Sequence, residues 1–153
     1  MPEHIHDHLT LKGRVRLAVW NPDGSLASEQ IVDNLVVTAG RALLAQAFAN
    51  PSIDVRVSHV ELGTGTTAPA NGDTVLETPS YRNAIASALN VSNVATLTGF
   101  FSATECNGTY REAGLFINGT GSLGTGTLLS RVAINITKSA IQTLTIEWAI
   151  TLS

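Results

Sequence analysis

The chain has 153 residues, of which 44% are hydrophobic and 14% are charged, and its formal net charge is −3. A chain of this length can form one domain that holds its core without a metal or a disulfide. The composition excludes a disordered chain, a coiled coil and a polybasic nucleic-acid-binding module, because few Lys and Arg residues are present to neutralise phosphates. The single cysteine, Cys106, excludes an internal disulfide.

No apolar run approaches the ~20 residues that a membrane-spanning helix needs, and residues 1–8 (MPEHIHDH) do not resemble a signal peptide. We therefore expect a protein that is made in the cytoplasm and binds neither membranes nor nucleic acid. The scarcity of charged side chains indicates that partner proteins cover part of the surface.

Apolar and polar side chains alternate over residues 9–20, which is the pattern of a half-buried strand. Val15 and Leu17 belong to the face that is expected to be buried. The Asn-Pro-Asp-Gly sequence at 21–24 predicts a turn, because Pro presets φ and Gly accepts the left-handed conformation. The return strand is expected over residues 26–37.

One helix is expected after this strand. Thr38 is the candidate N-cap, and apolar side chains recur at helical spacing until the Asn-Pro pair at 50–51 ends the segment. Gly40 falls in the first turn, where it lowers helix stability.

The rest of the chain is expected to form short strands with turns between them. The Asn-Gly pair at 107–108 is a strong hairpin signal, and two Gly- and Thr-rich loops are expected at 63–73 and 118–127. In the last strand Ile146 and Trp148 point to the same face. The expected strands span residues 55–62, 82–91, 94–104, 110–117, 128–137 and 141–152.

About eight short strands joined by turns predict an all-β fold. We expect an antiparallel β-sandwich or jelly-roll-like domain with one short α-helix. This domain is expected to span residues 11–153 and to follow an N-terminal arm of residues 1–10. No second domain or linker is predicted.

Two Gly-rich segments match dinucleotide-binding fingerprints in their letters. Residues 63–68 spell G-x-G-x-x-A and residues 119–124 spell G-x-G-x-x-G. Such a fingerprint functions only where the glycines open a helix whose N-terminus meets the phosphate. Here further Gly or Pro residues follow, and then a strand. We interpret both segments as flexible surface loops and predict no cofactor.

The sequence offers no candidate catalytic residue. Cys106 lies beside a predicted turn, and the nearest histidine in the sequence, His59, is too distant to supply a local base for the thiol. We interpret His59 as a structural residue. The carboxylates are scattered, and we expect Glu112 and Glu147 to form ion pairs within the sheet. Their candidate partners are Arg82, Arg111 and Arg131. We predict that the chain is not an enzyme.

His4, His6 and His8 alternate with other residues, so in an extended segment their imidazoles project to one side. Imidazoles aligned in this way can ligate a divalent transition metal, above all where chains converge on a symmetry axis. The same residues also fit a solvated or partner-contacting arm. We predict no metal site and keep these three residues as the candidates for one.

An ordered set of segments covers most of the chain from about residue 31 to the end. These are residues 33–40 (DNLVVTAG), 60–70 (VELGTGTTAPA), 73–77 (DTVLE) with Arg82, 111–116 (REAGLF), 128–131 (LLSR) and the final strand through Trp148. In their order and spacing they resemble a family of small structural proteins of tailed-bacteriophage virions. Similar sequences occur in capsid decoration (cement) proteins and in parts of tail fibres and tail adaptors.

The resemblance implies a structural protein of the virion without catalytic residues. The short chain favours a decoration protein that binds the major capsid protein on the outer head surface and stabilises contacts between capsid proteins. We expect a homodimer or homotrimer. The candidate partner-contact residues lie on the arm and on the two loops: His4, His6, His8, Leu9, Thr64, Thr66, Thr67, Pro69 and Leu123.

Two other functions stay open. A tail or baseplate adaptor, or a fibre-attachment protein, would bind tail proteins and occur in ring or trimer stoichiometry. A carbohydrate-binding module would need exposed aromatic residues, but only 5% of the chain is aromatic. Trp20 and Trp148 both fall on strands and are expected to pack in or near the core.

Overall fold

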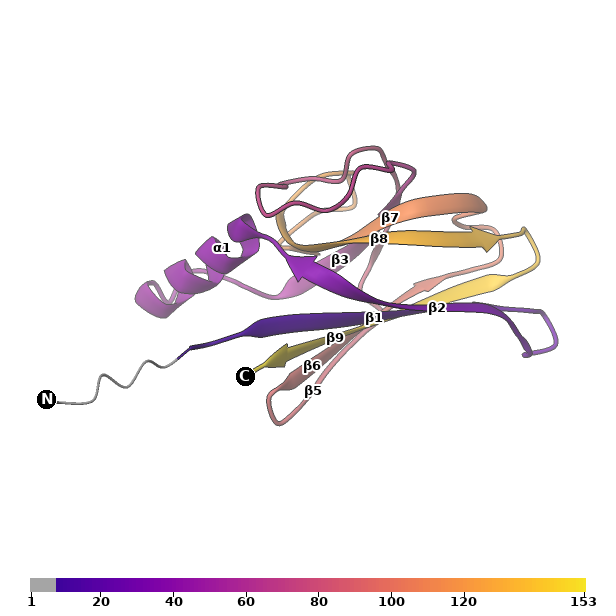
Figure 1. The fold of residues 1–153 in the computed structure, drawn as a ribbon. Coiled ribbons are helices and arrows are strands. Elements are labelled where there is room, and N and C mark those ends of the chain that lie inside the picture. Colours follow the sequence, from indigo (N-terminus) through magenta and orange to yellow (C-terminus); the bar gives the residue numbers. More distant parts are fainter. Residues whose placement is uncertain (1–7) are drawn as a thin grey trace, which may run out of the picture.

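A computed structural model describes residues 8–153 of the chain as nine β-strands and one α-helix (Figure 1). The elements are β1 (Leu11–Trp20), β2 (Leu26–Val36), α1 (Thr38–Ala49), β3 (Val57–Gly63), β4 (Pro79–Ala84), β5 (Ser87–Val91), β6 (Val94–Phe101), β7 (Gly108–Ile117), β8 (Thr127–Lys138) and β9 (Thr143–Leu152). The prediction of an all-β fold with one short helix is confirmed.

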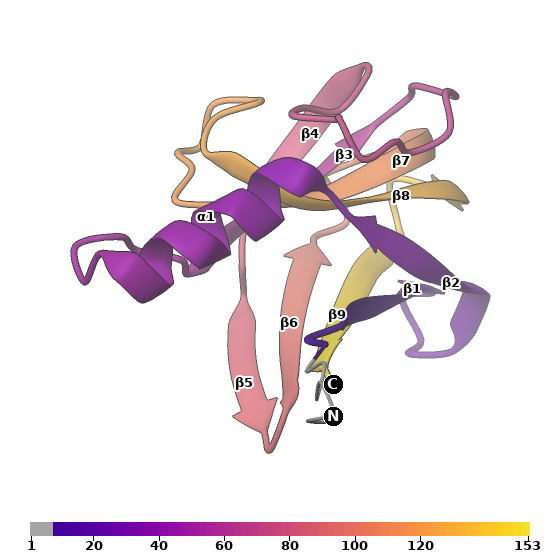
Figure 2. The same ribbon diagram turned by 60° about the vertical axis from the view of Figure 1, so that its left-hand side comes forward.

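The strands form one antiparallel sheet in the order β4-β3-β7-β8-β2-β1-β9-β6-β5. Strand β2 joins its two halves, because most of its length pairs with β1 while Leu35 and Val36 pair with β8. The sheet curls at this strand into two layers (Figure 2). We call β8, β7, β3 and β4 the β7 half, and β1, β9, β6 and β5 the β1 half. The two layers of the expected sandwich are thus halves of one sheet.

The predicted strand over residues 82–91 is in fact two strands. The N–H of Ile85 donates to Ser58 in the β7 half, whereas the N–H of the next residue, Ala86, donates to Thr98 in the β1 half. The chain therefore changes halves between β4 and β5. Alternation of side chains reports an extended backbone and carries no information about this change of partner.

The main core lies between the two halves. In β1, Val15, Leu17 and Val19 are fully buried as the alternation predicts, and in β9 Trp148 is only 1% exposed. The other tryptophan, Trp20, is half-buried, and its indole N–H donates to Thr145 at 2.9 Å. Trp148 thus packs in the core as expected. Trp20 is not among the described residues that pack against the core, and its ring instead lies 5.9 Å from the guanidinium of Arg16.

Helix α1 begins differently from the prediction. Thr38 is its first helical residue, and Val37 occupies the N-cap position without a side-chain capping bond. The backbone satisfies this end instead, because the N–H of Val37 donates to Leu129 and the N–H of Thr38 donates to Asn71. Gly40 is buried against β8, where an added Cβ would lie 2.8 Å from the Cα of Leu129. Close packing on the sheet thus explains a glycine that helix propensity disfavours.

Candidate functional site

Four buried charged side chains stand on the face of the β7 half that points away from the main core. Glu61, Arg82, Glu112 and Arg131 come from β3, β4, β7 and β8, and each side chain is at most 3% exposed. They form two ion pairs, Arg82–Glu61 at 2.8 Å and Arg131–Glu112 at 2.7 Å. An isolated charge at this depth would cost several kcal/mol, so both pairs need further hydrogen bonds. Two loops supply these bonds.

Loop 64–78, between β3 and β4, is attached to Glu112. One carboxylate oxygen, Oε1, accepts the N–H of Gly65 at 3.1 Å and that of Thr78 at 2.7 Å. The other, Oε2, accepts the N–H of Glu77 at 3.0 Å and two bonds from Arg131. All these partners are donors, so the site requires an ionised carboxylate.

Arg131 fastens the same loop at a second place. Its guanidinium donates to Asp73 at 2.7 Å and to the carbonyl of Thr67 at 3.0 Å. Desolvation raises the pKa of Asp73, but the hydrogen bonds from the Ala70 N–H and from Arg131 outweigh it, so this pKa lies below its ordinary value. A hydrogen bond from the Thr67 N–H likewise lowers the pKa of Glu77. Both groups therefore hold the loop in their ionised form.

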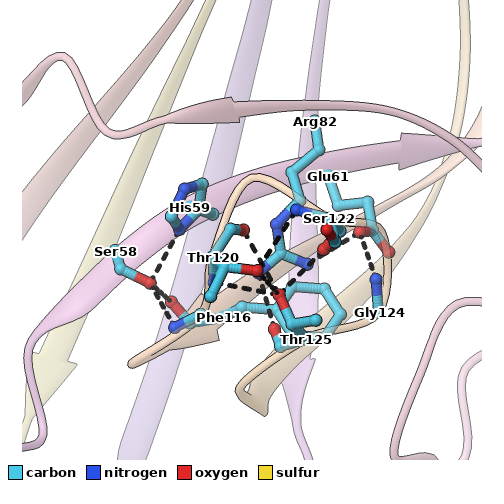
Figure 3. A network of polar contacts seen from close by, with 10 residues as sticks. Ser58, His59, Glu61, Arg82, Phe116, Thr120, Ser122, Gly124 and Thr125 are labelled. Carbon is cyan, nitrogen blue, oxygen red and sulfur yellow. Dashed lines mark hydrogen bonds and ion pairs between the residues drawn. The ribbon is translucent and has the colours of Figure 1, made fainter.

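Loop 118–126, between β7 and β8, is attached to the other ion pair (Figure 3). Glu61 accepts the N–H of Gly124 at 2.8 Å, and Arg82 donates to the carbonyl of Thr125 at 2.6 Å. The guanidinium also lies over the ring of Phe116, 4.5 Å from its centroid. Within the loop, the hydroxyl of Thr125 bonds to both ends of the 120–122 turn.

The interpretation of the two Gly-rich segments as flexible loops is therefore wrong, because buried carboxylates and arginines anchor both of them. Strands β4 and β8 follow the two loops in the chain, so neither loop opens a helix of the kind that the fingerprint requires. The loops are also neighbours: a Cβ added to Gly124 would lie 3.8 Å from the side chain of Val75. They present one surface together.

The structure separates the predicted partner-contact residues into two regions. Thr64, Thr66 and Thr67 are exposed on loop 64–78, with Pro69 half-buried, and Leu123 is 46% exposed on loop 118–126. His8 and Leu9 are exposed at the end of the sheet where β1 begins. His4 and His6 lie outside the described residues.

The anticipated ion pairs are confirmed in part. Glu112 pairs with Arg131, one of its candidate partners, and Arg82 pairs with Glu61. Glu147 is exposed and has no ion pair among the described residues, because Arg16, its cross-strand neighbour in β1, pairs with Glu29. His59 bonds to the hydroxyl of Ser58 at 2.9 Å, and desolvation lowers its pKa, which fits a structural role.

Cys106 is buried in a turn with a positive φ of 55°. Desolvation raises the pKa of its thiol to about 12, so the reactive thiolate is scarce near neutral pH. Sequence reasoning missed the residue that holds this turn: the buried Lys138 donates to the carbonyl of Ala103 and to the side chain of Asn107. A lysine at the end of an alternating strand carries no signal of burial.

An apolar groove of about 400 Å³ opens between α1 and the β5–β6 hairpin. Leu44 of α1 and Leu97 of β6 both line it, and so do Leu11 and Leu152 at the end of the sheet where β1 begins. The lining is predominantly aliphatic, with Arg56 as the charged member.

Within residues 8–153, no cluster of three or more His, Cys, Asp or Glu side chains is arranged to hold a metal ion. None of the helices in that range is long and apolar enough to cross a membrane. Comparison of the chain with family models, with curated proteins and with solved structures finds no match.

Proposed function

We propose that the chain is a structural protein of a tailed-bacteriophage virion and that it decorates the outer surface of the head. The observation that carries the proposal is the pair of anchored loops, 64–78 and 118–126. The backbone of both loops is held by buried ion pairs. Their exposed residues are mostly Thr, Ala and Gly, together with the apolar residues Val75 and Leu123. The resemblance of residues 31–153 to phage structural proteins supports the same role.

Anchored loops are well suited to a protein of which many copies bind to one large surface. A loop that is already ordered loses little conformational entropy on binding, so more of the contact energy appears as affinity. Repetition of the same contact over a shell of identical subunits adds avidity. The four buried charges serve to hold the loops.

A binding assay with heads of the encoding phage that lack this protein tests the proposal. We expect the Val75→Asp, Leu123→Asp double variant to lose cosedimentation with these heads, because it places charge on the contact surface of the loops. The matched control is Ile141→Asp, which changes a side chain that is 66% exposed in the turn before β9. Unimpaired binding of the double variant would exclude the loops as the contact surface.

The N-terminal arm is tested separately. Thr10 pairs through its backbone with Ser153, so a deletion should stop at residue 9 to preserve the sheet. We expect loss of head binding with an unchanged thermal unfolding midpoint. Retained binding by the shortened chain would show that the arm is dispensable.

The copy number per purified particle distinguishes the head from the tail. A decoration protein is present in hundreds of copies, whereas a tail or baseplate adaptor is present in a ring or a few trimers. Quantitative mass spectrometry of virions gives this number directly. A count in the range of tail proteins would move the proposal to the tail, and absence from the particle would overturn it.

A further inference from the structure

Strand β5 is one of the two edges of the curled sheet. It pairs with β6 on one side, and no strand of residues 8–153 pairs with its other side. All five of its residues are exposed, and Leu89 and Val91 are 67% and 78% exposed. An edge strand presents unpaired backbone N–H and C=O groups, which form a template for another extended segment.

Three usual protections of an edge strand, a proline, a charged side chain and a bulge, are missing from β5. It contains no proline and no charged residue, and its register with β6 runs without a shift from Ser87 to Val91. The opposite edge, β4, begins with Pro79, carries Arg82 and has an irregular register near Gly63. Natural sheets rarely leave a regular, uncharged edge open to solvent.

The absence of charge extends over the whole β5–β6 hairpin. No Asp, Glu, Lys or Arg occurs between Arg82 and Glu105, although such residues make up 14% of the chain. When two identical edges meet about a two-fold axis, any charge near the axis faces its own copy, and like charges in that position are destabilising. An uncharged edge avoids this repulsion. A partner with a charged edge would meet no opposite charge on the β5–β6 hairpin.

We propose that β5 is the interface between two copies of this chain, which pair their β5 strands antiparallel about a two-fold axis. The pairing satisfies the outward backbone groups of both edges and joins two sheets into one. Leu89 and Val91 project from the face opposite Leu97, whose cross-strand partner is Ala88. With the axis opposite Leu89, the two Leu89 side chains meet each other, and each Val91 lies opposite Ser87 of the other copy. This interface does not depend on the proposed virion role.

Sedimentation of the full chain over a range of concentrations tests the interface. We expect a reversible dimer, and we expect Leu89→Lys to weaken its association constant by about tenfold or more, because it places like charges directly across the axis. Val91→Lys should weaken the association less, because its two charges lie at opposite ends of the paired strands. The control is Ile141→Lys, an equally exposed apolar residue outside the edge, which should dimerise as the unmodified chain does. Far-ultraviolet circular dichroism verifies that every variant is folded.

Disulfide cross-linking provides a second readout in a chain that is unchanged in charge. Leu89→Cys should form covalent dimers under mild oxidation, while Ile141→Cys should not, and the buried Cys106 remains unreactive in both. A chain that stays monomeric up to about 1 mM, the weak end of specific affinities, overturns the proposal. So does an oligomer that persists in both lysine variants, or one in which only Ile141→Cys cross-links.

Discussion

Glu61 of β3 and Glu112 of β7 stand on the same face of the sheet, each directly opposite a glycine of the other strand. Glu61 pairs in register with Gly114, and Glu112 with Gly63. A Cβ on Gly63 would lie 2.5 Å from Oε1 of Glu112, so the missing side chain makes room for the carboxylate. This diagonal arrangement places one buried carboxylate under each loop, and each carboxylate pairs with a different arginine.

Glu112→Gln should lower the free energy of unfolding by about 3 kcal/mol, the scale for breaking a buried ion pair. Both carboxylate oxygens accept bonds from donors, so either orientation of the Gln amide sets its NH₂ against an N–H. Urea denaturation measures the loss. The control Glu147→Gln changes an exposed carboxylate and should stay within about 0.5 kcal/mol of the unmodified chain.

Hydrogen exchange in the same variant tests whether the effect is local. The amides of Gly65 and Thr78, which bond to Glu112, should exchange faster, whereas the amide of Gly124, which bonds to Glu61, should be unaffected. Equal acceleration at all three amides would contradict the independent anchoring of the two loops.

The free energy of unfolding should fall at acidic pH, because Asp73 and Glu77, which help to hold loop 64–78, become protonated. Because the pKa of Asp73 is lowered in the folded state, its contribution is complete above the ordinary value of 3.8 and is lost as pH drops through the lower folded value. Asp73→Asn should therefore destabilise the chain at pH 7 by about 1.5–3 kcal/mol, the range for a hydrogen bond to a charged group. The difference should shrink toward zero below pH 3.8 in urea titrations. A difference that is independent of pH would argue against this linkage.

Gly40→Ala should destabilise the chain although alanine is the better helix former. The added Cβ meets the backbone of Leu129, at 2.8 Å from its Cα and 2.9 Å from its carbonyl oxygen. Overpacking costs about 1–3 kcal/mol, which exceeds the gain of about 1 kcal/mol in helix propensity. The reverse change at an exposed position of α1, Ala45→Gly, should cost about 1 kcal/mol. Thermal unfolding of both variants measures the two effects, and a stabilised Gly40→Ala variant would contradict the packing.

The thiol of Cys106 should react slowly in the folded chain. It is 1% exposed, and its pKa of about 12 leaves little thiolate at pH 8. A disulfide reagent such as Ellman's should therefore label it at the rate of opening of the fold, and rapidly in urea. Fast labelling under native conditions would show that the turn around Cys106 is open to solvent.

Much of the architecture could be predicted because strand formation leaves a local signature. Alternation in β1 and β9 identified the buried faces. The hairpin expected at the Asn-Gly pair 107–108 is wrong, because β6 pairs with β5 and β9 whereas β7 pairs with β3 and β8. The sequence also identified Glu112 as a structural carboxylate beside small residues. It left the choice among three arginines open, because no local rule specifies a partner that is 19 residues away.

The composition and periodicity of the chain thus determined an antiparallel β fold of short strands with one helix and two Gly-rich loops. Tertiary structure alone decided that Ile85 and Ala86 bond to opposite halves of the sheet, that the loops are anchored on Glu61 and Glu112, and that α1 needs a glycine against Leu129. The reason is the range of the interactions. Side-chain alternation and turn preferences act over a few residues, whereas strand pairing and buried ion pairs join segments that are far apart in the chain.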